Sequence, residues 1–427
     1  MRKRICFTVL FLILSLVEVG CGDNRHPEDP SQTEKADTAS KAGALGYGYF
    51  FEEDGIVVSS AERFLYSDWE PVEFDYICMD PTCTHLTESC SAHTIHDEKS
   101  VRRDFSVVYQ DRLIILHACS QFVDNESTEK VWDYSIMYQT DVYEADPDGS
   151  NRRKVAAFSG AIDSPSIIDA AVLAEGKLYF GGVTEVRNRI GQDILGGEAT
   201  NRTWASTAIY CLDLNDYTVE TFAVTENKEG TPTYLHQFYE YDGMIYGIIS
   251  YFQTLQIDSA VWCRIDPVTG VYEEILRFDS NAARFCGAIG DTVYYWYENS
   301  AKTLCAKDIS EGAKEREIMT VTGENTFINP FILDRRILIM TDRRMEGKEH
   351  MAEYTVLDPE GKVLDTIRYD AYITFLDVVG DKILYFELAT DSDWEICWAN
   401  KEDLADLPKK GVRIGPLNGS ALDRLVD

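Results

Sequence analysis

The segment YDGMIYGII, residues 241–249, places a tight polar turn directly before a strand of alternating apolar and aromatic residues. The same arrangement recurs along the chain, with the acidic residue of the turn at Asp54, Asp111, Glu175, Asp242, Asp291, Asp334 and Asp381. These residues follow one another at intervals of 43 to 67 residues. Forty-odd residues is the length of a four-stranded propeller blade, and the longer intervals need only inserted loops.

A second element follows each of these turns in the same order. It consists of an apolar strand, a turn centred on Asp with Pro or Gly, and another strand, which together predict a hairpin. Clear copies lie at 142–155, 209–222, 261–276, 304–318 and 353–367. With one strand before each polar turn, every repeat holds four strands.

We therefore predict an all-β fold, a single β-propeller of about seven four-stranded blades over residues 47–427. Six or eight blades remain open. A pair of β-sandwiches would not keep two hairpin types in fixed order, and a parallel β-helix would have a much shorter period.

The N-terminus predicts export. Residues 1–20 combine a basic start, Arg2 to Arg4, with an apolar run too short to span a bilayer. Cys21 follows a small residue, as in the lipobox of bacterial lipoproteins, although Glu18 departs from that pattern. We expect a lipid on Cys21, a flexible tether over 21–46 and a protein anchored at the extracytoplasmic face of the cell membrane. A cleaved, freely secreted protein is the alternative.

The charge narrows the range of partners. The chain has a formal net charge of −33 and a pI of about 4.5. A surface this anionic repels phosphate backbones, which excludes general nucleic-acid binding.

Four cysteines share one position in their repeats, near the start of the third strand: Cys211, Cys263, Cys305 and Cys397. Equivalent positions in different blades are too far apart to bridge, so we expect small buried apolar residues between the blades.

The most specific local motif is ICMDPTCTHLTESCSAH, residues 77–93. Cys78, Cys83, His85 and Cys90 have the ligand count of a closed zinc site. Their spacing matches no standard zinc signature, so a disulfide among the three cysteines and plain reduced thiols remain open. In either of the first two cases the cysteines should lie close together.

At this motif the chain resembles a group of exported, TolB-like β-propeller lipoproteins of Gram-positive gut anaerobes. The shared element is C-x-D-P-x-C-x-H, here Cys78, Asp80, Pro81, Cys83 and His85. The resemblance covers the export signal, the tether, this element and the rhythm of the blades. It implies a propeller lipoprotein, and it implies little about activity.

Two long insertions, residues 118–135 and 184–206, fall between the second and third strands of their repeats. We expect them to be loops on one face of the propeller, which the Cys-His loop also crosses, because function usually lies in elaborated loops on a rigid scaffold. Aromatic residues in or beside such loops are the candidate ligand-binding residues: Trp132, Trp204, Phe252 and Trp394.

These features favour a surface protein that binds a protein or glycan ligand. The chain has no G-x-S-x-G, H-E-x-x-H or P-loop motif, so catalytic residues cannot be assigned. One alternative is a glycan- or peptidoglycan-active hydrolase, which two close carboxylates in a central pocket would favour. Another is a structural or sensor lipoprotein with a zinc or disulfide loop.

Overall fold

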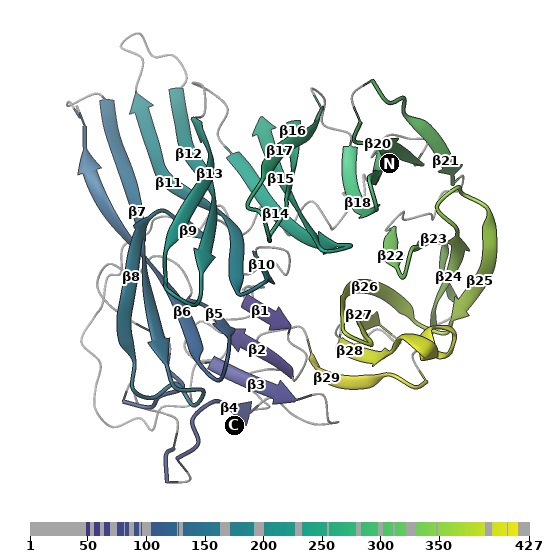
Figure 1. Cartoon of the computed structure of the whole chain (residues 1–427), viewed down its shortest axis with the longest axis horizontal. Helices are drawn as coiled ribbons and strands as arrows, with labels where there is room; N and C mark the ends of the chain where they lie inside the picture. Colours follow the sequence, from purple (N-terminus) through teal and green to yellow (C-terminus); the bar gives the residue numbers. More distant parts are fainter. Residues whose placement is uncertain are drawn as a thin grey trace.

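The computed structural model describes residues 48–416 with internal gaps, of which the longest cover 96–103, 163–170, 192–199 and 322–329. The described residues form 29 β-strands and a short 3₁₀ helix, η3 (Lys401–Asp406). The sheets follow one another around a common centre in chain order, as in a β-propeller (Figure 1). The all-β prediction and the propeller arrangement are confirmed. The predicted signal peptide and tether, with Cys21, lie outside the described residues.

Five sheets have four antiparallel strands each, in simple up-and-down order. Their strands are β1 (Gly48–Phe51), β2 (Gly55–Ser59), β3 (Phe64–Asp68) and β4 (Asp75–Tyr76); β14 (Thr233–Tyr241), β15 (Met244–Gln253), β16 (Gln256–Ile265) and β17 (Tyr272–Phe278); β18 (Ala283–Ile289), β19 (Thr292–Tyr297), β20 (Thr303–Asp308) and β21 (Arg316–Thr320); β22 (Phe331–Leu333), β23 (Arg336–Glu346), β24 (Glu349–Leu357) and β25 (Val363–Tyr369); β26 (Tyr372–Val379), β27 (Lys382–Leu388), β28 (Glu395–Asn400) and β29 (Val412–Pro416).

The prediction of about seven separate four-stranded sheets is wrong, because one nine-stranded sheet stands where the sequence predicts the second and third repeats. Its strands are β5 (Phe105–Val108), β6 (Leu113–Asp124), β7 (Val131–Ala145), β8 (Arg153–Ser159), β9 (Ala161–Ile162), β10 (Ala171–Ala174), β11 (Lys177–Gly191), β12 (Thr200–Asp213) and β13 (Val219–Glu226).

The reason is that the two predicted loop insertions are largely strand. β7 and β11 are 15 residues long, and they pair with one another from Val131–Gly191 to Met137–Glu185. We call this paired stretch the seam. The two extended hairpins, β6–β7 and β11–β12, are therefore joined by backbone hydrogen bonds between β7 and β11. A projecting hairpin of only two strands would be marginally stable by itself. The extended hairpins project beyond the other sheets in Figure 1.

The recurring polar turns are confirmed as the link between the first and second strands of a sheet. Asp242 and Gly243, between β14 and β15, have φ angles of 50° and 77°. Such positive angles at both central residues are what a two-residue hairpin turn requires. Glu175 with Gly176 and Asp334 with Arg335 repeat the pattern, whereas Asp54 lies outside the described residues.

The core lies mainly between neighbouring sheets, where apolar residues of one sheet pack on the next. The four equivalent cysteines, all at most 3% exposed, belong to this core as predicted: Cys211, Cys263, Cys305 and Cys397. Burial raises the pKa of the Cys263 thiol to about 12, which suits a small inert apolar side chain. No helix of the described residues is long and apolar enough to cross a membrane.

Candidate functional site

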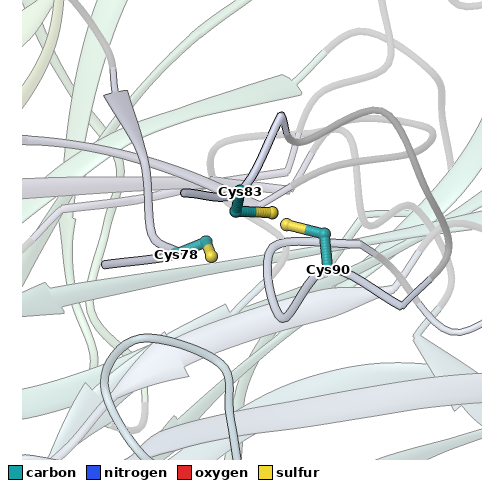
Figure 2. Close-up of side chains that lie close together, drawn as sticks. All are labelled: Cys78, Cys83 and Cys90. Carbon is teal, nitrogen blue, oxygen red and sulfur yellow. The ribbon is translucent and has the colours of Figure 1, made fainter. Parts of the chain in front are cut away.

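Three cysteines of the loop between β4 and β5 converge. The sulfur atoms of Cys78, Cys83 and Cys90 all lie within 4.8 Å of one another. Figure 2 shows the sulfurs of Cys83 and Cys90 directed toward one another, with Cys78 beside them. Among the residues that the structure describes, this is where three potential metal ligands from His, Cys, Asp or Glu come together. We call it the thiol cluster.

Local turns shape the loop. The Asp80 carboxylate accepts hydrogen bonds from the backbone N–H and the hydroxyl of Thr82, at 2.8 and 2.7 Å. The Cys83 N–H donates to the Asp80 carbonyl at 3.0 Å, and the His93 N–H donates to the Cys90 carbonyl at 3.1 Å. These Asx-type and β-turns bring the separated cysteines to one point.

The loop is docked on both neighbouring sheets. On one side, the Phe64 N–H at the start of β3 donates to the Ala92 carbonyl at 2.7 Å. On the other, the Ser91 hydroxyl donates to the Asp148 carbonyl at 2.6 Å, and Arg152 donates to the Ser91 carbonyl. Asp148 and Arg152 lie in the turn between β7 and β8, so the loop joins the first sheet to the second.

The thiols differ in their electrostatic surroundings. Burial raises the pKa of the Cys90 thiol to about 11. Burial also opposes ionisation of Cys78, but hydrogen bonds from Ser91, from the Asp80 backbone and from the other two thiols outweigh it and lower the pKa of Cys78. The cluster therefore contains one thiol whose pKa is lowered and one whose pKa is raised.

The predicted ligand set is confirmed in part. Cys78, Cys83 and Cys90 are brought together, whereas His85 lies outside the described residues. The sequence did not predict a buried polar pair at the end of the loop. Asp104 and His117 are each at most 2% exposed, and Asp104 Oδ1 lies 2.6 Å from His117 Nδ1. No pattern within the sequence marks this pair, since the two residues are 13 apart and belong to different elements.

The four predicted ligand-binding aromatics do not form one group. Trp132 lies on β7 opposite Ile190, and Trp204 lies on β12 opposite Arg187. Phe252 lies on β15 in another sheet, and Trp394 lies outside the described residues. Trp132, Trp204 and Phe252 are strand residues, and Trp132 and Phe252 each lie within two residues of a link between the second and third strands of a repeat.

Trp132 instead belongs to an exposed apolar surface of the seam. Directly opposed and alternate strand residues share a face, so Phe122, Trp132, Tyr134 and Ile190 lie on one side of the sheet. Phe122 and Trp132 are 64% and 65% exposed and Ile190 is 37% exposed. The Phe122 and Tyr134 rings stack with centroids 4.9 Å apart. We call these four residues the aromatic face.

The opposite side of the seam carries its charges. Arg187 donates two hydrogen bonds to the buried Asp133 carboxylate, and these bonds lower the pKa of Asp133. The alternation was visible in the sequence, since apolar Val186 and Ile190 alternate with charged Arg187 and Arg189. This pattern is typical of a strand with two different faces, and it could have indicated that the insertions are not loops.

The thiol cluster and the aromatic face are separate sites. Trp132 is the second residue of β7, whereas the turn that docks the cysteine loop follows its last residue, Ala145. At about 3.3 Å per residue, the two ends of β7 lie roughly 45 Å apart along the strand. The prediction that the cysteine loop crosses the same surface as Trp132 is therefore wrong.

A cavity of about 490 Å³ lies between β8 and the β12–β13 hairpin. Its lining includes Phe158, Tyr210 and Thr221 and contains no carboxylate or imidazole. This cavity gives the hydrolase alternative no support, because two close carboxylates are what that chemistry requires.

No protein-family model matches the chain, and no curated protein matches it. Solved structures that resemble it include a puromycin-hydrolysing peptidase of Mycobacterium tuberculosis, at a TM-score of 0.44 and 10% identity. That match covers 90% of this chain and 55% of the peptidase, so the chain spans about half the peptidase's length.

Two further structures are similar at the same low level. An uncharacterised protein of Listeria monocytogenes matches with a TM-score of 0.40 and 11% identity, over 76% of this chain and 85% of that one. The β-propeller domain of the Trilobed protease from Pyrococcus furiosus matches with a TM-score of 0.31 and 11% identity, over 70% and 96%. Structural similarity at these TM-scores does not indicate what activity this protein has.

Proposed function

We propose that this protein is an exported lipoprotein, anchored through Cys21, whose propeller binds a polypeptide at the extracytoplasmic face of the membrane. The observation that carries the binding role is the aromatic face. Phe122, Trp132 and Ile190 are exposed together on a rigid sheet, where no part of the described core needs them. Contiguous exposed apolar residues on a folded scaffold typically mark interaction surfaces.

The residue types favour a polypeptide over a glycan. Trp, Tyr and Phe are enriched at the centres of protein interfaces, where they supply most of the binding energy. A sugar site also needs several converging polar groups to fix the hydroxyls, and the charged residues of the seam, Asp133 and Arg187, lie on its other side.

The charge indicates the kind of polypeptide. A second copy of this chain would carry the same net charge of −33, so repulsion opposes self-association. A basic polypeptide would be attracted by the same field. Among the described residues, the rim of the aromatic face also offers a strand edge, because β5 pairs with β6 only from Leu113 to Leu116, while β6 continues to Asp124. An extended segment could add to that edge.

The test uses the full chain displayed on cells or held in detergent micelles, probed with a peptide array that includes basic sequences and with a glycan array. We expect basic, aromatic-rich peptides to bind, and Trp132→Ala to weaken that binding at least about tenfold. Val363→Ala is the matched control, because Val363 is a 55% exposed apolar residue in a different sheet.

Equal loss of binding in the Trp132 and Val363 variants would contradict a specific role for the aromatic face. Binding to glycans with no binding to peptides would replace the polypeptide with a sugar ligand. Absence of binding on both arrays would overturn the proposed role.

The anchor has a separate test. Cys21→Ala removes the thiol that would carry the lipid, so the protein should leave the membrane fraction or remain unprocessed. Cys119→Ala, which changes a thiol on β6, should leave membrane partitioning unchanged. A Cys21→Ala protein that still partitions with membranes would rule out lipid anchoring at this residue.

A further inference from the structure

The geometry of the thiol cluster points to a metal site, which is independent of the proposed binding role. A tetrahedral zinc ion with Zn–S bonds of about 2.3 Å separates its sulfur ligands by about 3.8 Å. The three sulfurs lie within 4.8 Å of one another, so small movements of the side chains would bring them to that spacing. We propose that Cys78, Cys83 and Cys90 bind one Zn²⁺ ion as three thiolate ligands.

The number of cysteines favours a metal over a disulfide. A disulfide uses two thiols, and the third would remain beside it, where thiol–disulfide exchange could open the bond. A zinc ion uses all three, and thiolates are ligands that zinc prefers. In a tetrahedral site, three protein ligands leave one position for water or another donor.

The surroundings suit sulfur ligands that carry negative charge. The Ala92 N–H donates to the Cys90 sulfur at 3.4 Å, a hydrogen bond of the kind that orients a ligand from outside the coordination shell. One Zn²⁺ with three thiolates has a net charge of −1. The Arg152 guanidinium, which donates to the Ser91 carbonyl next to Cys90, supplies a positive charge nearby.

The packing of the protein also buries part of the loop from solvent and holds it in place without the ion. Cys90 is 5% exposed and packs with Phe64, Ile77 and Ala92 in the core between the first two sheets. Hydrogen bonds to β3 and to the β7–β8 turn fix its position on both sides. The ligands are therefore largely preorganised, which reduces the entropy lost on metal binding.

The experiment uses the full chain purified in reductant without chelator. Elemental analysis should find one zinc per chain, and X-ray absorption should find three sulfur neighbours at about 2.3 Å. Replacement by Co²⁺ should give a sulfur-to-cobalt charge-transfer band in the near ultraviolet. These measurements need no variant, so they stand even if a substitution prevents folding.

Cys78→Ser, at one of the two partly buried members of the cluster, should weaken zinc binding at least about tenfold. Cys119→Ser, which changes a thiol outside the cluster, should leave zinc binding unchanged. Equal effects of the two substitutions would overturn the proposal. Two of the three cysteines joined by a disulfide in the isolated protein, or three titratable thiols with no bound zinc, would also overturn it.

Discussion

Arg187 on β11 holds Asp133 on β7 by two parallel hydrogen bonds, from Nε to Oδ1 and from Nη2 to Oδ2, each 2.9 Å long. The Asp133 side chain is 3% exposed, whereas Arg187 is 43% exposed. This bidentate ion pair crosses the seam, and it compensates a carboxylate that the pairing of β7 with β11 removes from water. The position of the aromatic face on the other side of the sheet depends on this pairing.

We expect Arg187→Ala to lower the free energy of unfolding by about 1–3 kcal/mol, because Asp133 would lose its charged donor while remaining buried. Arg189→Ala is the matched control. Its guanidinium lies 3.8 Å from Asp133 and is 56% exposed, so its loss should cost less than about 1 kcal/mol. Urea unfolding of the two variants measures both values, and equal losses would contradict the assignment of the main contact to Arg187.

Stability should also depend on pH through Asp133. Hydrogen bonds from Arg187 lower the pKa of Asp133 in the folded protein, below the ordinary value of about 3.9. A carboxyl group of this kind stabilises the fold above its unfolded pKa, and the stabilisation is lost as the pH falls through the folded pKa. The difference in unfolding free energy between the parent protein and Asp133→Asn should have its maximum value near pH 7 and should decrease below about pH 4. A constant difference over that range would contradict the assignment.

The sequence predicts the repeat because the repeat is local. Asp242 and Gly243 sit in a two-residue turn whose positive φ angles favour short polar residues and glycine, and alternation marks the strands on either side. The buried cysteines, such as Cys263, follow from their fixed place in that pattern. The convergence of Cys78, Cys83 and Cys90 was predictable for the same reason, since one short loop contains all three.

Contacts between repeats could not be predicted in this way. The seam includes the contact between Asp133 and Arg187, which are 54 residues apart in the sequence. A strand that pairs with a neighbouring hairpin has the same local sequence pattern as one that pairs within its own repeat. The cysteine loop likewise docks on the β7–β8 turn through a hydrogen bond between Ser91 and Asp148, which are 57 residues apart. The separation of the thiol cluster from Trp132 follows from these pairings.

Gly149, in the turn that docks the cysteine loop, should tolerate no side chain. Its φ angle is 74°, and a β-carbon there would overlap the Ser91 carbonyl oxygen. Gly243 is the matched control, since its φ angle is 77° but an added β-carbon would meet nothing within 4 Å. Gly243→Ala should cost roughly 1–2 kcal/mol for the backbone conformation alone, and Gly149→Ala should cost clearly more because the loop must move. Thermal or urea unfolding would show the order, and similar losses would mean that the Ser91 contact is not tight.

The last prediction concerns the buried pair at the end of the cysteine loop. Asp104 bonds His117 through Oδ1 and accepts the Ile95 N–H through Oδ2 at 2.7 Å, so its carboxylate ties the loop to β6. Asp104→Ala should cost about 3–5 kcal/mol of unfolding free energy, because it leaves the buried His117 imidazole and the partly buried Ile95 N–H without that partner.

His117→Leu should also destabilise the fold, since Asp104 would lose its contact with the imidazole and keep only the hydrogen bond from the Ile95 N–H. In the double variant the two losses should not add, because neither the imidazole that loses its carboxylate partner in Asp104→Ala nor the carboxylate that loses its imidazole partner in His117→Leu is then present. A double-mutant cycle by urea unfolding measures this coupling. Strictly additive losses would mean that the 2.6 Å contact contributes nothing, and that the loop is held by its backbone hydrogen bonds and apolar packing instead.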